Sequence, residues 1–500
     1  MEYSFKTICV WLLAVAVLCG CSQSDDVTAS ETREATEQET PEVVFRLTTS
    51  ASSSPTTRSA EDSYVYVQGT ADEYRVTKVR VYFYDTSTKL FAKSILLTNL
   101  TRTGSDSNGN VIYESEHVAV PQGTFDIFVT ANTDRQINKE TEMEFLADVD
   151  SMTYVRGIVD DVSGGIVMTN RATENLGTVI VKRQGYADNV IGITLERVLA
   201  RLDIAKSAES FPLTETNGRK YASVTLDGYY IVNLPKYYYS FRHTAVLSNL
   251  TEPEWKISEN FGNVSDVNGY VIDPYFFKKK INAADYSNAD KYYVNFLGDY
   301  ANPRAVTWTP FKPVVDQPQY TTVYCLENCA LAPAQKNGYS TGVFFRATLE
   351  PNNNVYHLAS GGELVLVTDK SNYPEVLYYY NYNFYDSPEA LAAAAGVASV
   401  TSAEFETLQT RKFEKSDDGY RCYYIYWIRH LDNFKDTEMG VMEFGIVRNN
   451  LYRMLVTNVS GLGYQDPVIN PDIPDEGETF LKVMLSVKPW IVRDLTDIVL

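Results

Sequence analysis

The sequence contains few of the residues that build metal centres and nucleophilic active sites. It has six cysteines and four histidines in 500 residues. The histidines are far apart, and none of them begins the H-E-x-x-H pattern of zinc hydrolases. Fingerprints of phosphate-binding loops and of dinucleotide binding are also missing. We therefore expect a protein that is not an enzyme and that needs no metal or cofactor.

Positive charge is also scarce. There are 44 Lys and Arg residues against 64 Asp and Glu residues, which gives a net charge of −20. Nucleic acids and anionic membrane surfaces attract cationic proteins. The charge therefore argues against a nucleic-acid partner and fits an exported protein with an acidic surface.

The cysteines of the second half predict neither a redox motif nor a zinc site. They are Cys325, Cys329 and Cys422. Cys325 and Cys329 are separated by three residues, whereas redox motifs have the C-x-x-C spacing and zinc sites need a second pair of ligands. A local disulfide and two structural thiols both remain open, and we favour the thiols.

Cys19 and Cys21 follow a short apolar segment. The run Ile8–Leu18 is too short to span a bilayer and has the length of the apolar part of a signal peptide. The tetrapeptide Leu18–Cys21 that ends it resembles a bacterial lipobox, and the acidic stretch Ser22–Asp26 resembles the export signal of Bacteroides-type surface lipoproteins. The resemblance implies cleavage before Cys21 and acylation of that cysteine. The alternative is a buried N-terminal helix with chance cysteines.

Residues 22–40 are polar and are expected to form a flexible tether, which is followed by a strand and an exposed loop. Val43, Phe45 and Leu47 alternate with other residues, so they lie on one face of a strand. The loop Ser50–Ser59 consists of small residues without periodicity, and such loops are preferred sites of proteolysis.

The rest of the chain reads as an all-β protein. With 37 tyrosines and 22 phenylalanines it is rich in residues that favour pleated sheets. Short alternating segments separated by turns are typical of β-sandwiches. The clearest of them are Val79–Tyr84, Thr124–Asn132, Arg201–Ile204, Val343–Leu349, Tyr423–Ile428 and Tyr452–Val459.

Two features interrupt this pattern. The polar stretch Lys206–Asn217 predicts a domain boundary near residues 205–215. Ser387 and Pro388 can begin a helix, which the alanine-rich run to Ala395 continues. We expect this helix to lie in a loop insertion.

Two further motifs have both a functional and a structural interpretation. Gly338–Gly342 matches the G-x-S-x-G nucleophile elbow, but that elbow needs a strand before the serine and a helix after it. Here a strand follows, so we favour a turn that enters a strand. The runs Tyr237–Tyr239 and Tyr378–Tyr380 could stack on sugars, although cross-strand packing explains them at least as well.

The C-terminus carries a strand behind an acidic, proline-rich linker, Gln465–Glu478. Leu481, Val483, Leu485 and Val487 alternate with other residues and lie on one face. A strand behind a semi-rigid linker can reach a sheet in another molecule. The alternative is a last strand that joins its own domain.

Several segments resemble signatures of the type V fimbrillin family. Gln122–Asn132 resembles the G-x-Y-x-V-x-V-x-x-A-N strand of that family, and Arg197–Leu202 resembles its R-x-x-A-R segment at the domain junction. The segments of the second half that are similar to the minor-fimbria shaft-subunit branch are Tyr324–Asn328, Tyr426–His430, Phe444–Tyr452 and Trp490–Val492.

The resemblance implies two transthyretin-like β-sandwich domains and polymerisation by strand exchange. An Arg-specific protease would cut between Arg58 and Ser59, and the segment with Val43, Phe45 and Leu47 would then be displaced. Leu481, Val483, Leu485 and Val487 of another copy would act as the donor strand. The implied partners are further copies of the chain, accessory anchor and tip subunits, the protease and, before cleavage, the outer membrane.

This interpretation divides the chain into five parts. The expected bounds are 1–20 for the signal peptide, 21–58 for the propeptide, 59–205 and 206–464 for the two sandwiches, and 465–500 for the linker and donor strand. The expected product is a shaft subunit of a cell-surface fimbria that supports adhesion and biofilm formation. The alternative function is a surface glycan-binding lipoprotein of a polysaccharide-uptake system.

Overall fold

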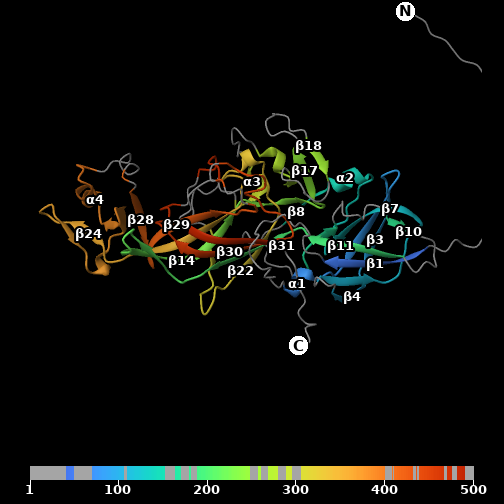
Figure 1. Ribbon diagram of the computed structural model, residues 1–500, viewed down its shortest axis with the longest axis horizontal. Helices are drawn as coiled ribbons and strands as arrows, with labels where there is room; N and C mark the ends of the chain where they lie inside the picture. The colour runs from blue at the N-terminus through green and yellow to red at the C-terminus, as the bar shows by residue number, and fades with distance from the viewer. Residues whose placement is uncertain are drawn as a thin grey trace, which may run out of the picture. The chain divides into compact units, whose positions relative to one another are not determined.

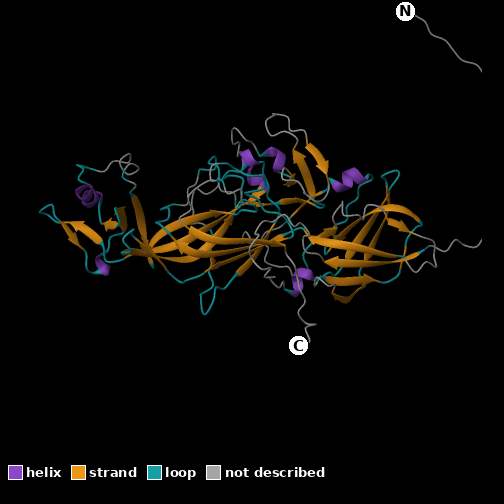
Figure 2. Cartoon of the chain, in the orientation of Figure 1, coloured by secondary structure: helices purple, strands orange, loops and turns teal. Residues whose placement is uncertain are grey.

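The computed structural model describes most of the chain between residues 41 and 489. The described ranges are 41–49, 70–105, 110–152, 164–170, 179–181, 189–247, 257–260, 269–279, 289–295, 306–399, 408, 410–431, 435, 438–466, 470–475 and 481–489. In this part of the chain strands dominate and helices are short (Figure 2). No helix in it is both long and apolar enough to cross a bilayer.

The first half of the chain builds a ten-stranded sheet (Figure 1). Eight of its strands follow one another in space as β3 (Phe91–Leu97), β2 (Val79–Asp85), β7 (Gly123–Ala131), β9 (Met168–Asn170), β11 (Val190–Arg197), β1 (Glu42–Thr49), β5 (Val111–Ser115) and β4 (Leu100–Ser105). Two short strands, β10 (Val179–Val181) and β6 (Val118–Ala119), pair with β7 and β1.

Strand β2 shows why this sheet is buried on both faces. Val79, Val81 and Phe83 point into the main core of the first half. Tyr82 and Tyr84 point to the opposite face and pack among further aromatic rings under helix α2 (Glu142–Leu146). Because successive side chains of a strand alternate between faces, one apolar run supplies both cores.

The second half builds a sandwich of two sheets. The smaller sheet has the order β22 (Thr321–Cys325), β12 (Ala200–Lys206), β30 (Asn450–Val459) and β31 (Leu481–Pro489). The larger has the order β13 (Phe211–Thr214), β14 (Lys220–Val232), β23 (Gly342–Pro351), β29 (Gly419–Trp427), β28 (Arg411–Ser416), β26 (Val376–Tyr380), β27 (Asn383–Tyr385), β24 (Val355–Leu358) and β25 (Leu364–Leu366), with β21 (Thr309–Pro310) beside β14.

Residues of both sheets form one core, which is what defines a sandwich. Leu202 and Met454 come from the smaller sheet, and Leu226, Phe345 and Cys422 come from the larger. The predicted all-β fold is confirmed. The change from the first core to the second falls at Val198–Leu199, ahead of the boundary expected near residue 205, because β12 already pairs with β22 and β30.

Smaller elements fill the space around these sheets. The additional pairings are β15 (Leu234–Pro235) with β20 (Tyr293–Val294), β16 (Tyr237–Tyr239) with β8 (Val149–Ser151), and β17 (His243–Leu247) with β18 (Ile257–Asn260) and β19 (Gly269–Ile272). The remaining helices are α1 (Ala71–Tyr74), α3 (Ala289–Tyr292), α4 (Pro388–Ala395), η1 (Phe276–Lys278), η4 (Ala332–Ala334) and η5 (Lys370–Asn372).

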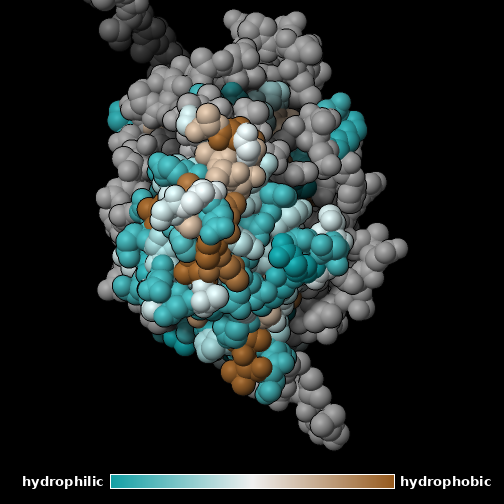
Figure 3. All heavy atoms as spheres, turned by 90° about the vertical axis from the view of Figure 1, so that its left-hand side faces the viewer, coloured by the Kyte–Doolittle hydropathy of each residue, from teal (hydrophilic) through white to brown (hydrophobic). Residues whose placement is uncertain are grey.

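Helix α4 is the alanine-rich helix expected from the sequence. The Ser387 hydroxyl accepts a hydrogen bond from Ala390 N, and Gly396 ends the helix with φ of +70°. The helix packs on Tyr385 and other side chains of β24 to β27. Figure 3 views this end of the molecule, where apolar side chains gather among hydrophilic ones, and Val365 and Leu366 of β25 are among the exposed apolar residues.

Candidate functional site

The first strand, β1, lies inside the sheet rather than at its edge. On one side it runs parallel to β11, with Val44 to Thr49 opposite Val190 to Leu195. On the other side it is antiparallel to β5 and to β6. Strands β5 and β11 thus flank β1 in the sheet, and we call the space between them, which β1 fills, the β1 groove.

The side chains predicted for the inner face of β1 are buried in the core. Val43, Phe45 and Leu47 are at most 1% exposed, and Thr49 is 3% exposed. The Phe45 ring meets the Phe83 ring edge to face, with centroids 6.2 Å apart. The groove therefore receives four consecutive inward side chains, of which the first three are large and apolar.

The backbone of β1 is also satisfied where the facing strand is interrupted. Between β5 and β6 the ladder breaks, and there Phe45 N donates to the Ser115 hydroxyl at 3.0 Å. On the outer face Arg46 Nε lies 2.7 Å from a Glu114 carboxylate oxygen. Such an exposed ion pair contributes about 0–1 kcal/mol, so burial rather than charge holds the strand.

The C-terminal strand, β31, lies at the edge of the smaller sheet of its own domain. Among the strands that the structure describes, its ladder partner is β30, with Asn450 opposite Pro489 and Val459 opposite Leu481. Leu481 is 4% exposed, and Val483 is half-buried against the same core. For Leu485 and Val487 the structure describes the backbone alone, opposite Met454 and Tyr452. The structure therefore shows the arrangement that the sequence left open as the alternative to donation.

The linker before β31 is hydrogen-bonded to the turn that precedes β23. Asn337 N donates to Ile473 O at 3.0 Å, and Gly338 N donates to Pro471 O at 2.9 Å. Asp475 is 3% exposed and accepts a hydrogen bond from the Ser340 hydroxyl. Burial raises the pKa of Asp475 to about 8. The linker is thus held in place at Asp475, six residues before β31 begins.

A buried charge cluster joins the segment after the loop to the second half of the chain. The Glu73 carboxylate of α1 is fully buried, lies 3.0 Å from Arg201 Nη1 and accepts a 2.6 Å hydrogen bond from the Tyr324 hydroxyl. Arg201 also contacts Asp203 at 2.8 Å. Arg197 Nε donates to Glu73 O at 2.7 Å. Helix α1 is therefore anchored to β12 and β22.

A second buried cluster lies beside the first. Arg448 Nη2 is 2.7 Å from a Glu327 carboxylate oxygen, and Arg242 Nη2 is 3.0 Å from Glu196. The motif residues Arg197, Arg201, Glu327 and Arg448, although far apart in the sequence, thus meet where the two halves join. Glu73 was not among the predicted site residues, although Thr70 and Glu73 have the spacing of a capping box, which the structure shows.

The structure explains the motifs that could have indicated catalysis. Gly338–Gly342 is a turn that enters β23, as predicted. Cys325, Cys329 and Cys422 are free and buried, so the preference for thiols over a disulfide is confirmed. Burial raises the pKa of Cys422 to about 12, which makes that thiol a poor nucleophile.

The tyrosine runs serve packing. Tyr238 is buried, and its hydroxyl donates to Asp150 at 3.1 Å. Tyr378 and Tyr380 pack against the α4 side of their sheet. These contacts fit cross-strand packing rather than a sugar platform.

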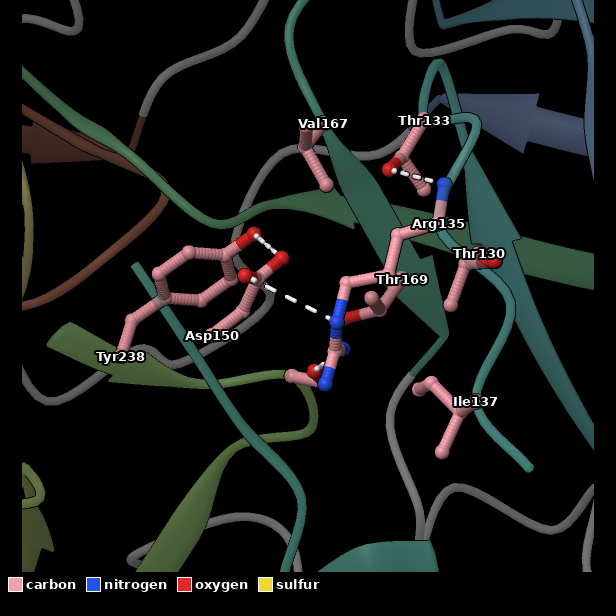
Figure 4. Close-up of a pocket in the computed structure, with 9 residues that line it drawn as sticks. Thr130, Thr133, Arg135, Ile137, Asp150, Val167, Thr169 and Tyr238 are labelled. Carbon is pink, nitrogen blue, oxygen red and sulfur yellow. Dashed lines mark hydrogen bonds and ion pairs between the residues drawn. The ribbon is translucent and has the colours of Figure 1, made fainter. Parts of the chain in front are cut away.

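The pocket in Figure 4 combines polar and charged side chains, and its charged groups form ion pairs with one another. Arg135 lies 2.5 Å from Asp148 and 3.7 Å from Asp150, and Asp150 in turn accepts from Tyr238. The single cation is paired with both carboxylates, which leaves the group with one net negative charge. We assign no chemistry to this pocket.

Three predicted positions, Cys21, Arg58 and Ser59, lie outside the described residues. The described chain nevertheless brackets the expected cleavage point. Strand β1 ends at Thr49, and α1 begins at Ala71.

Two family models match the sequence. The model of the major fimbrial subunit protein FimA matches residues 42–223. The model of the C-terminal part of fimbrillin, the type IV major fimbrial subunit protein, matches residues 417–496. No curated protein matches the chain.

Solved structures of fimbrial proteins are also similar to the chain. A fimbrilin (FimA) from Porphyromonas gingivalis W83 is 17% identical with a TM-score of 0.43, and the match covers 91% of this chain and 99% of that one. The tip fimbrial protein Mfa3 from Porphyromonas gingivalis is 12% identical with a TM-score of 0.32, covering 90% and 100%. A fimbrial assembly protein from Parabacteroides distasonis ATCC 8503 is 11% identical with a TM-score of 0.25, covering 65% and 98%.

Proposed function

Because the chain belongs to the fimbrillin family of major fimbrial subunits, we propose that it is a shaft subunit of a cell-surface fimbria and that it polymerises by strand exchange. In the proposed filament β31 of one copy replaces β1 of the next. The observation that carries this proposal is the contrast between the two strands, since β1 is central and β31 is at an edge.

The different positions of β1 and β31 in their sheets favour movement of β31 from the edge of its own sheet into the β1 groove. Among the described strands β31 has one ladder, at the edge of its sheet, whereas in the β1 groove it would have two, along β11 and β5. A net 0.5–1.5 kcal/mol per hydrogen bond makes an added ladder of about four bonds worth roughly 2–6 kcal/mol. Transfer of β31 into an empty groove is therefore favourable before the cost of association.

The side-chain patterns of the two strands also match. Leu481, Val483, Leu485 and Val487 repeat the spacing of the four inward positions of β1. Burial of four such side chains is worth roughly 6–12 kcal/mol gross. Because β31 must first leave the core of its own domain, most of this burial energy only replaces burial energy that is lost there. The sign of the free energy of exchange therefore depends on the added ladder of hydrogen bonds.

Proteolysis would open the groove. A cut after Arg58 severs β1 from the remaining chain, while Glu73 keeps α1 bound to Arg201 and Tyr324. The segment removed would carry both β1 and the lipid on Cys21, so an outer-membrane precursor becomes a free subunit. Head-to-tail donation does not close on itself, and it therefore yields a filament. Its ends would be occupied by anchor and tip subunits.

The domain limits follow from this division. We propose 1–20 as signal peptide, 21–58 as propeptide, 59–205 and 206–464 as the two domains, and 465–500 as linker and donor. The change of sheet at Val198–Leu199 favours moving the limit between the two domains to that point.

A peptide experiment tests the exchange without altering the fold of the subunit. The precursor is cut with an Arg-specific protease, and a labelled peptide of residues 481–489 is added in excess. We expect the peptide to bind and to release the β1 segment, because it fills both ladders. The same peptide with Val483→Asp and Leu485→Asp should not bind, since a buried unpaired carboxylate is costly. Equal binding of both peptides would contradict the proposal.

A further inference from the structure

A buried lysine lies outside the groove and the domain junction. Lys279, which follows η1, has a side chain that is 0% exposed. Its Nζ lies 2.7 Å from Asp273 Oδ2 and 2.8 Å from Asn328 Oδ1, and it also donates to Cys329 O. An amine, a carboxylate and a carboxamide therefore share a site that contains little water.

The Asn328 carboxamide is oriented toward the lysine. Its Nδ2 donates to Tyr339 O and to the Thr341 hydroxyl, both at 2.8 Å. Its Oδ1 faces Lys279 Nζ and also lies 3.2 Å from the Tyr293 hydroxyl. The carbonyl oxygen is thus polarised by two donors, the Lys279 ammonium and the Tyr293 hydroxyl, the latter also lying 3.0 Å from Tyr339 O.

We propose that Lys279 and Asn328 join in an intramolecular amide bond, with Asp273 transferring the protons. Asp273 takes a proton from the Lys279 ammonium, and the neutral amine attacks Asn328 Cγ. The Tyr293 hydroxyl stabilises the oxyanion that forms at Oδ1. Asp273 returns this proton to Nδ2 and then takes the second proton from the attacking nitrogen, the bond between Cγ and Nδ2 breaks, and one ammonia molecule leaves, so that Asp273 ends protonated.

The surroundings favour this reaction over its competitors. Lys279, Asp273 and Asn328 are each at most 4% exposed, so water that could hydrolyse the carboxamide is excluded. Burial raises the pKa of the neighbouring Cys329 thiol well above its usual range, so that side chain stays protonated and unreactive.

The bond would join two segments that are 49 residues apart in the sequence. One follows β19 and contains η1, and the other follows β22. The crosslink would hold these segments together under mechanical load or partial unfolding. It does not depend on strand exchange, since all its atoms lie in one chain.

Peptide mass spectrometry of the purified, folded chain decides between a crosslink and a simple ion pair. We expect the peptides that contain Lys279 and Asn328 to appear as one branched species, lighter than their sum by one ammonia molecule. In the K279R variant, which keeps the positive charge but has no amine at that position, the two peptides should be separate. Separate peptides of full mass from the folded wild-type chain would overturn the proposal, whether or not K279R folds.

Discussion

The substitution Phe45→Ala should destabilise the precursor but not the filament. In the precursor Phe45 is 0% exposed and meets Phe83 edge to face. Truncation of a buried phenylalanine typically costs about 3–5 kcal/mol. The free energy of unfolding of the precursor, measured in urea, should fall by that amount. The stability of the assembled filament should not change, because the proposed filament has lost residue 45.

The substitution should also change the rate of assembly. A loss of about 3–5 kcal/mol corresponds to a change of roughly 10² to 4 × 10³ in the equilibrium for β1 release, since each 1.4 kcal/mol is a factor of about ten. Where release of β1 limits polymerisation of cut precursor, light scattering should therefore show faster growth.

Phe125→Ala is the matched control. Phe125 lies on β7 in the same core and packs against Phe83 with ring centroids 5.6 Å apart, but it stays in the sheet after cleavage. Its truncation should destabilise the precursor and the filament alike. If Phe45→Ala weakens the filament as much as Phe125→Ala does, β1 remains in place and the exchange is refuted.

Three further predictions concern processing, the domain junction and pH. The Arg58→Ala precursor should keep an acylated Cys21 and remain unpolymerised, whereas the mature wild-type chain should begin at Ser59. If N-terminal analysis finds Ser59 at the start of the variant as well, cleavage does not depend on Arg58. Glu73→Gln should lower the free energy of unfolding by about 3 kcal/mol, because it leaves the Arg201 charge partly uncompensated in the interior; a loss below about 1 kcal/mol would contradict the proposed anchor. Burial lowers the pKa of His243 from 6.5 to about 4. The contribution of neutral His243 to the free energy of unfolding is therefore fully present above pH 6.5, and up to about 3 kcal/mol of it is lost as the pH drops toward 4. In urea titrations across this range, the His243→Gln variant should lack this pH-dependent contribution.

Local patterns were sufficient to predict several of the strands. Alternation identified Val79–Tyr84 and Val343–Leu349, which are parts of β2 and β23. The cap at Ser387 identified α4. Such signals depend on neighbours in the sequence, so one chain is enough to detect them.

The position of a strand within its sheet could not be predicted in the same way. The β1 sequence shows an inner face, but its central place depends on β11, which is about 150 residues away in the chain and pairs with it in parallel. For β31 the sequence permitted both its own sheet and another. Pairing partners far away in the chain decide such questions, and periodicity carries no information about them.

The buried charges of the junction were predicted only in part. Arg197 and Arg201 were noticed as a motif, but Glu73 belongs to a four-residue helix in a polar stretch. An acidic residue there normally faces solvent. Only the approach of β12 and β22 makes it a buried partner.

A structure of the assembled filament, determined by electron cryo-microscopy, tests the central claim most directly. The groove between β11 and β5 should contain residues 481–489 of a neighbouring copy, and residues 42–49 should be missing from every subunit. A filament in which β1 still fills the groove and β31 still pairs with β30 of its own chain would contradict the account.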